Sequence, residues 1–324
     1  MSSGVKIRTI LSGNKMTTPI TQQTYCINRL NIGSVEMRIG DAAPDKTLKI
    51  IALHGWLDNA YSFKPLFDLW QKKDLPSFAP FEAIHCIAFD LVGHGLSKHR
   101  PYGTHYHLVD YLRDVVHLAD TLNWASFTLL GHSLGGGLCL LLAGLFPDRV
   151  QSVISIEGAG PHIQPDFKDW LTQTRFFFSQ DKKGADKKLP CYPTQEEGIL
   201  ARQKGNVTGA ICEQAVRILC ERGLVQTEKG WMWRTDPRLL LPSVLRFQEV
   251  QVIELFTEIC CPVLLILAKE GSLKKASYLS ARSQAIKKLT TIELSGDHHL
   301  HMEAALPAIL QAMSDFLMDA PRVF

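Results

Sequence analysis

Ser133 has the surroundings of a serine that could act as a nucleophile. It stands at the centre of the pentapeptide Gly-His-Ser-Leu-Gly at 131–135, between the apolar runs 128–130 and 138–143. A strand, a Gly-x-Ser-x-Gly turn and a helix in this order are typical of a nucleophile elbow, which exposes the serine hydroxyl on a strained turn. Only glycine avoids steric conflict where the segments crowd together, and the helix N-terminus favours negative charge. We predict that Ser133 is a catalytic nucleophile.

A base must accept the proton of this serine, because a free hydroxyl is a poor nucleophile at neutral pH. The chain contains twelve histidines. His132 adjoins the serine and is expected to point away from it, and His94 is expected to be structural within a loop. His298, His299 and His301 follow the last predicted strand, where the base falls when the chain order is serine, acid, histidine. One of these three is the predicted base.

Two glutamates compete for the role of the acid that orients the base. Glu157 ends the apolar run 150–156, and Glu270 follows the apolar run 263–267. A carboxylate at the end of a buried strand must be paired or exposed at an active site, because an isolated buried charge is costly. This favours Glu157, whereas Glu270 could be an ordinary exposed turn residue. Asp297 adjoins His298 and is expected to point away from it.

Hydrogen-bond donors must stabilise the oxyanion that forms when a carbonyl carbon is attacked. The backbone N–H of Leu134 directly follows the serine, and that of Trp56 follows His54-Gly55 after the apolar run 49–53. Donors of this kind each contribute roughly 3 kcal/mol to transition-state stabilisation. We predict that Trp56 and Leu134 form the oxyanion hole through their backbones.

These residues lie at the ends of apolar runs that alternate with helical patterns. The predicted strands are 49–53, 83–89, 128–130, 150–156, 262–267 and 289–294, of which the first two read as buried. The predicted helices include about 61–70, 107–122 and 306–318. Regular alternation indicates an α/β fold with a parallel sheet covered on both faces. Two further strands, 24–30 and 34–39, are expected to form an antiparallel pair joined across 31–33.

The alternation stops between residues 160 and 241, which predicts an insertion into the core. We expect residues 1–23 to be a flexible leader, 24–159 and 242–324 to form the core, and 160–241 to form a helical lid over Ser133. The charged stretch 181–188 is expected to be a solvated loop. Aromatic residues at 176–178 and 231–233 would either line the pocket or fill the core of the lid itself.

Composition excludes several classes of function and partner. The 324 residues carry a formal net charge of +3, which gives no reason to expect nucleic acid or an anionic membrane as the main partner. No apolar stretch is long enough to span a bilayer. The eight cysteines lack metal-finger spacing. We expect no metal or cofactor and a small-molecule substrate. The expected location is cytoplasmic, and the alternative, for which there is no clear signal, is peroxisomal or vesicle-associated. The oligomeric state stays open.

The order of motifs resembles that of the α/β-hydrolases. The motifs are His54-Gly55-Trp56, Asp90 with 93–97, the pentapeptide 131–135 and Gly296-Asp297-His298, and the resemblance covers nearly the whole chain from residue 24. Segments 54–59, 158–161 and 233–239 look most like the serine hydrolase-like proteins. The resemblance implies an α/β-hydrolase fold, with a mostly parallel eight-stranded sheet flanked by helices and a helical lid inserted after the sixth strand.

The resemblance also narrows the choice of base and acid. His298 fits the family spacing to Glu303 better than His299 does. The usual acid position, near residue 271, holds Gly271 in this chain. The other known position, at the end of the strand after the elbow helix, is used by haloalkane dehalogenases and coelenterazine luciferases, and Glu157 occupies it here. The predicted catalytic residues are therefore Ser133, His298 and Glu157, with Glu270 as the alternative acid.

The leading hypothesis is a serine hydrolase that cleaves a small, apolar ester, thioester or amide through an acyl-enzyme on Ser133. The alternative is a catalytically inactive hydrolase-fold protein that binds a ligand. A dehalogenase-like or luciferase-like activity is a third hypothesis, suggested by Glu157. It is disfavoured because those relatives carry aspartate at the elbow, and serine cannot form the same alkyl-ester intermediate.

Overall fold

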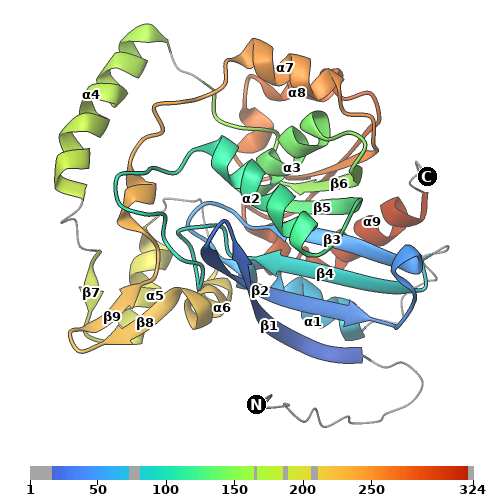
Figure 1. Ribbon diagram of the computed structural model, residues 1–324, viewed down its shortest axis with the longest axis horizontal. Coiled ribbons are helices and arrows are strands. Elements are labelled where there is room, and N and C mark those ends of the chain that lie inside the picture. Colours follow the sequence, from blue (N-terminus) through green and yellow to red (C-terminus); the bar gives the residue numbers. More distant parts are fainter. Residues whose placement is uncertain (1–16, 73–80, 164–165, 185–188, 206–210, 320–324) are drawn as a thin grey trace.

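The centre of the molecule is a sheet of eight strands in the order β1-β2-β4-β3-β5-β6-β10-β11 (Figure 1). The computed structural model describes residues 17–72, 81–163, 166–184, 189–205 and 211–319. The strands are β1 (Thr17–Ile27), β2 (Leu30–Ile39), β3 (Thr47–Leu53), β4 (Ala83–Phe89), β5 (Phe127–His132), β6 (Val150–Ile156), β10 (Val263–Ala268) and β11 (Leu289–Leu294). Strands β1 and β2 are antiparallel, and β2 is antiparallel to β4. The remaining pairs are parallel, which confirms the predicted mostly parallel eight-stranded sheet.

Helices cover both faces of the sheet, which explains why its inner strands are continuous apolar runs. Along β3, Ile50 and Ala52 face one hydrophobic cluster, whereas Ile51 and Leu53 face the other. The first cluster contains α1 and α9, and the second contains α2, α3 and α7. The helices are α1 (Lys64–Lys72), α2 (Leu108–Thr121), α3 (Leu134–Leu145), α7 (Glu249–Thr257), α8 (Leu279–Ala285) and α9 (Leu306–Asp319). Among the described residues, none of the helices is both long and apolar enough to cross a membrane.

The N-terminal hairpin differs from the expectation at two points. Strand β1 begins at Thr17, so residues 17–23 belong to the sheet rather than to a flexible leader; residues 1–16 lie outside the described part. β1 is an edge strand that pairs only with β2, so its residues do not need to alternate between apolar and polar. The sequence pattern therefore did not indicate a strand here. The turn lies at Asn28 and Arg29, both with positive φ, rather than at 31–33. Two left-handed residues in a two-residue loop match the twist of a β-hairpin.

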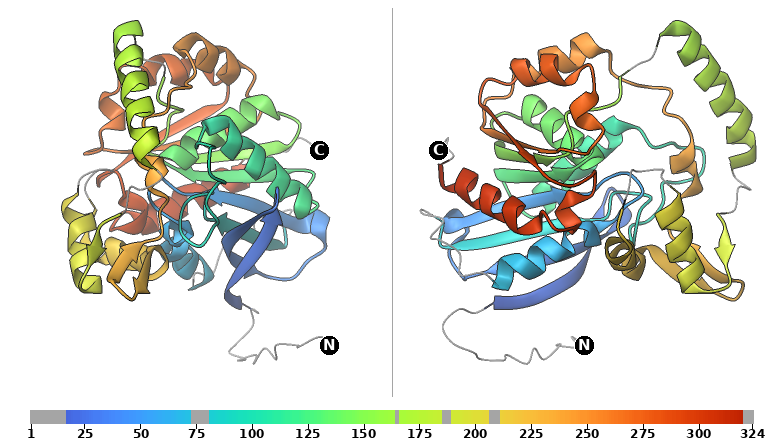
Figure 2. Two further views of the ribbon diagram at one scale, coloured as in Figure 1. Left: turned by 60° about the vertical axis from the view of Figure 1, so that its left-hand side comes forward. Right: turned by 180° about the vertical axis from the view of Figure 1, so that it is seen from behind.

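The segment predicted as a helical lid, 160–241, contains a small sheet as well as helices (Figure 2). We call its described residues the cap. Its elements are α4 (Phe167–Gly184), β7 (Cys191–Tyr192), α5 (Gln195–Lys204), α6 (Glu213–Gly223), β8 (Leu224–Thr227) and β9 (Gly230–Trp233). The purely helical expectation was wrong because β8 and β9 are only four residues each, too short to show a strand pattern. Helix α4 extends into the charged stretch 181–188, whose last four residues lie outside the described part.

Two buried ion pairs join the cap to the core. The Arg222 guanidinium on α6 donates from Nε to both oxygens of Asp90, at 3.0 and 2.8 Å. The Arg202 guanidinium on α5 lies 2.8 Å from Asp58, in the loop after β3. Both carboxylates are almost completely buried. Since each buried charge needs its partner, these pairs fix the position of α5 and α6 on the loops that end β3 and β4.

Candidate active site

Ser133 lies on a sharply turned backbone between β5 and α3. Its φ is 53° and its ψ is −114°, a conformation that costs energy in a residue other than glycine. Gly135 shows why the neighbouring positions need glycine, because a Cβ there would stand 1.9 Å from the carbonyl oxygen of Leu53. The turn therefore holds the hydroxyl at the carboxyl edge of the parallel strands, as the sequence pattern predicts.

His298 lies next to the serine hydroxyl, although the two are far apart in sequence. Its Nε2 is 2.9 Å from Oγ of Ser133, and its Nδ1 is 3.3 Å from Oε2 of Glu157. A carboxylate can only accept a hydrogen bond, so this geometry assigns the proton to Nδ1. Nε2 then carries the lone pair that can accept the serine proton.

Glu157 is buried directly after β6 and is held in place by the end of β10. Its Oε1 accepts a hydrogen bond of 2.7 Å from the backbone N–H of Ala268. A Cβ at Gly271 would lie 2.6 Å from Oε2 of Glu157. The position where the superfamily usually carries its acid is thus too close to Glu157 for a side chain, unless the glutamate shifts.

Glu270 is directed elsewhere. It is exposed, and its Oε2 accepts a hydrogen bond of 2.6 Å from the backbone N–H of Gly296. The structure thus brings together Ser133, His298 and Glu157 and leaves the alternative acid bound to a turn.

The loop that carries the predicted oxyanion donor is held by a buried histidine. His54 donates from Nδ1 to the carbonyl oxygen of Gly55 at 2.7 Å, and its Nε2 accepts from the N–H of Leu91 at 2.9 Å. Burial lowers the pKa of His54 to about 4, so its ring is neutral at pH 7. Trp56 follows this anchor, and Trp56 and Leu134 line the same cavity as Ser133. The sequence analysis did not predict this positioning role of His54. The available signal was its position directly before Gly55-Trp56.

Three further histidines contact groups other than the serine hydroxyl. His132 donates from Nε2 to the backbone carbonyl of His298 at 2.8 Å, and therefore supports the backbone of the candidate base. His299 lies 3.3 Å from Asp58. His301 contacts Oγ of Ser62 at 2.6 Å. All three are fully buried, so their tertiary positions agree with the choice of His298 as the base.

The tertiary structure also assembles a group that spacing along the chain did not indicate. One possible ligand atom from each of Asp58, His132 and His299 lies within 4.8 Å of the others. Arg202, however, is in contact with Asp58 and already supplies positive charge there. Burial by itself would raise the pKa of Asp58, but His299 and Arg202 hold that pKa well below its ordinary value. The Asp58–Arg202 ion pair, with the rings of His132 and His299 beside it, supports the loop after β3.

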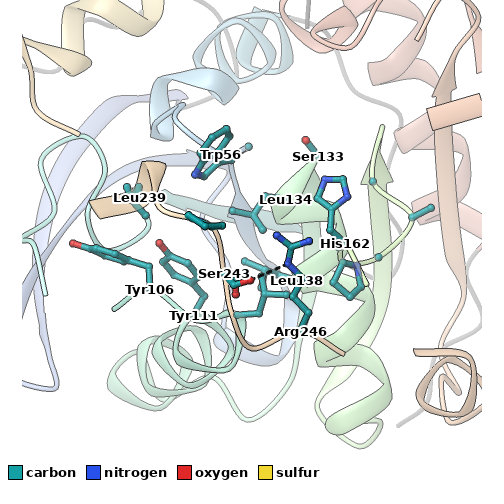
Figure 3. Close-up of a pocket in the computed structure, with 18 of the residues that line it drawn as sticks. Trp56, Tyr106, Tyr111, Ser133, Leu134, Leu138, His162, Leu239, Ser243 and Arg246 are labelled. Carbon is teal, nitrogen blue, oxygen red and sulfur yellow. Dashed lines mark hydrogen bonds between the residues drawn. The ribbon is translucent and has the colours of Figure 1, made fainter. Parts of the chain in front are cut away.

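A cavity of about 950 Å³ opens at Ser133 (Figure 3). Core and cap both line it, the cap with Phe176 of α4 and with residues 238–241. Trp231 and Trp233 instead pack against the hydrophobic cluster of α5 and α6. Of the two aromatic groups in the cap, one therefore contributes to the cavity and the other to the core of the cap.

Comparison with known proteins agrees with this architecture. A family model described as the alpha/beta hydrolase fold matches residues 50–190. A serine hydrolase-like protein of Dictyostelium discoideum is 30% identical over 287 residues, which cover 85% of this chain and 76% of that protein. The crystal structure of a hypothetical protein from Pseudomonas aeruginosa PAO1 is 32% identical with a TM-score of 0.77, covering 92% of this chain and 98% of that one.

A further relative has a named reaction. 2-(Acetamidomethylene)succinate hydrolase of Mesorhizobium japonicum is 24% identical over 302 residues, which cover 93% of this chain and 99% of that protein. Together with the sheet order and the strand-turn-helix at Ser133, these similarities settle the family: the chain belongs to the α/β-hydrolase superfamily and is similar to its serine hydrolase-like members.

Proposed function

We propose that the protein is a serine hydrolase that cleaves an ester, thioester or amide through an acyl-enzyme on Ser133. The observation that carries this proposal is the hydrogen-bonded series from Ser133 to His298 to Glu157, with distances of 2.9 and 3.3 Å, at the mouth of a cavity. Nucleophile, base and orienting acid stand within reach of one another, which is the arrangement that activates a hydroxyl.

In the acylation step, Oγ of Ser133 forms a bond to the carbonyl carbon while its proton passes to Nε2 of His298. The carbonyl oxygen becomes an oxyanion, which accepts hydrogen bonds from the backbone N–H groups of Trp56 and Leu134. Glu157 stabilises the imidazolium through Nδ1–H. When the tetrahedral intermediate collapses, the bond to the leaving group breaks and His298 returns the proton to that group.

Deacylation repeats the same proton transfers with water as the nucleophile. His298 takes a proton from water, the hydroxide oxygen bonds to the acyl carbon, and Ser133 leaves with the proton that His298 returns. The products are a carboxylic acid and the regenerated serine. One relative is named as a hydrolase of 2-(acetamidomethylene)succinate, which supports hydrolysis as the reaction class without naming the substrate of this chain.

A fluorophosphonate probe tests the proposal directly, because it labels only an activated serine. We expect the native protein to be labelled, with the adduct mapped to the peptide that contains Ser133. Ser133→Ala should abolish both labelling and esterase activity while leaving the thermal unfolding midpoint within a few degrees of the native value.

Two results would contradict the proposal. Labelling of Ser133→Ala at the native rate would place the reactive group elsewhere. A native protein that is folded but neither labelled nor active toward a panel of esters, thioesters and amides would instead be an inactive hydrolase-fold protein that binds a ligand.

A further inference from the structure

The cavity at Ser133 contains an arginine side chain that has no acidic partner among the described residues. Arg246, in the segment before α7, is half-buried and lines the cavity. Its Nε donates a hydrogen bond of 3.1 Å to the backbone carbonyl of Ser243. Figure 3 shows this bond and the two terminal nitrogens of the guanidinium pointing toward the side on which Ser133 lies. The side chain is therefore anchored by one nitrogen and presents the other two to the cavity.

The other charged side chains that line the cavity already have partners. Arg238 lies 2.7 Å from Asp236 and donates to three backbone carbonyls as well. Asp58 is paired with Arg202, and Glu157 faces the candidate base. Within the part of the chain that the structure describes, no carboxylate comes within ion-pair distance of Arg246.

An unpaired guanidinium in such a place has an energetic cost. Burial lowers the pKa of Arg246, and no neighbouring carboxylate opposes this effect. The nearby His162 also has a lowered pKa, caused by its burial and by the charges of Arg246 and Arg282, so its ring does not add charge at pH 7. Arg282 is paired with Glu249, so Arg246 is the cation of this region that no described carboxylate neutralises. A bound anion would offset the cost through charge-assisted hydrogen bonds.

The wall that leads from the serine to this region is apolar. Leu134, Leu138 and Leu141 lie at intervals of four and three residues on α3, so they share one face of the helix. All three line the cavity. A ligand that extends from Ser133 along this face would have an apolar middle section and a polar far end.

We propose that Arg246 binds a carboxylate of the substrate, so that the acyl compound cleaved at Ser133 carries a second, anionic end separated by an apolar segment. This inference rests on the proposed hydrolase function. The two free nitrogens suit the bidentate geometry of a carboxylate. One guanidinium also matches the single charge of a carboxylate better than the nearly double charge of a phosphate monoester. The expected apolar substrate is thereby refined to an amphipathic one.

Binding can be measured without turnover by using Ser133→Ala. The probes are monomethyl esters of linear dicarboxylic acids of six to ten carbons, each compared with the dimethyl ester of the same acid. Titration calorimetry should show that the monoester of the best length binds about 10- to 100-fold more tightly than its neutral diester, as expected for hydrogen bonds to a charged group.

The same titrations with Arg246→Met in the Ser133→Ala background test the residue. This change should remove the preference for the monoester. Arg175→Met is the matched control, because Arg175 is exposed on α4 and is not among the residues that line the cavity; it removes the same charge and should retain the preference. Thermal unfolding shows whether each variant is folded, and Arg246→Gln replaces Arg246→Met if the latter is not.

Equal binding of monoester and diester at every length by Ser133→Ala would overturn the inference, and so would a preference that survives in the folded Arg246 variant. Activity assays of the protein with Ser133 intact separate the two proposals. If it hydrolyses no ester, thioester or amide but the preference depends on Arg246, the anion site stands and the hydrolase function fails. If it hydrolyses diesters and monoesters alike, with no preference in binding, the hydrolase function stands and the anion site is wrong.

Discussion

At the scale of single residues, the candidate acid lies at the end of β6 rather than at the end of β10. This placement explains why position 271 holds a glycine. Glu157 reaches His298 from the end of β6, and the space that it needs is provided by Gly271, where a Cβ would lie 2.6 Å from the carboxylate. Ala268 supplies a backbone N–H to the other carboxylate oxygen. The end of β10 therefore binds the candidate acid, Glu157, and does not itself carry an acid.

We predict that Glu157→Gln lowers kcat by about 10³- to 10⁴-fold, because an amide no longer stabilises the imidazolium or fixes the proton on Nδ1. Glu270→Gln is the matched control and should lower kcat by less than about threefold, because its side chain bonds to Gly296 in an exposed turn. Steady-state kinetics with the best ester found in the substrate panel would measure both variants. A large loss in Glu270→Gln and a small one in Glu157→Gln would reverse the assignment.

At the scale of elements, the cap is part of the folded unit because its helices complete buried ion pairs of the core. Asp90 follows β4 and is fully buried, and it accepts hydrogen bonds from the N–H groups of Ala60 and Leu96 as well as from Arg222 of α6. The carboxylate thus joins the loop after β3, the loop after β4 and the cap. Loss of any one partner of Asp90 should therefore disturb the loops that carry Trp56 and the cavity wall.

Two arginines on α6 give a direct test of this view. Arg222→Met should lower the free energy of unfolding by about 3–5 kcal/mol, because it leaves the Asp90 carboxylate buried without its cation. Arg217→Met removes the same charge from the same helix, but Arg217 is exposed and pairs with Glu196 and Glu213 at the surface, so its effect should be much smaller. Urea unfolding of both variants would measure the difference. Equal losses would show that burial of the pair is not what stabilises the joint between cap and core.

At the scale of the whole molecule, several buried histidines link stability to pH. Burial lowers the pKa of His54 to about 4, and burial together with neighbouring histidines lowers the pKa of His94 and His301 to about 3. In the unfolded chain these groups titrate near 6.5. As the pH falls below 6.5 the unfolded state binds protons that the folded state does not bind, so acid favours unfolding.

We therefore predict that the free energy of unfolding falls by at least about 4 kcal/mol between pH 7.5 and 5.5, about 1.3 kcal/mol for each of these three histidines. Burial also lowers the pKa of His132 well below its ordinary value, which adds to the fall in the same direction. Asp58 does not contribute here, since its lowered pKa affects stability only when the pH falls below its unfolded value near 4. Denaturant unfolding at several pH values would measure the slope, and His94→Gln should reduce the fall in free energy by about 1.3 kcal/mol. A stability that is constant across this range would show that the histidines do not remain neutral in the folded protein.

The sequence by itself determined the features that depend on local pattern. The apolar runs of the inner strands are continuous because both faces of the sheet are covered, so β4 and β6 could be placed to the residue and β3 to within two residues. The turn at Ser133 could be predicted because only glycine tolerates the crowding around it. The β8–β9 hairpin and the first residues of β1 could not be predicted, since β8 and β9 have only four residues each and the described side chains of β1 are mostly exposed.

Only the tertiary structure decided which of several equivalent residues meet. Only the family spacing to Glu303 favoured His298 over the adjacent His299, and the structure shows that the first faces Ser133 and the second faces Asp58. Glu157 and Glu270 both follow strands, but only one points to the base. Likewise, no pattern marks Arg246 as an unpaired cation and Arg238 as a paired one. Such choices depend on side-chain direction and on partners from distant segments, which exist only once the strands are aligned in the sheet.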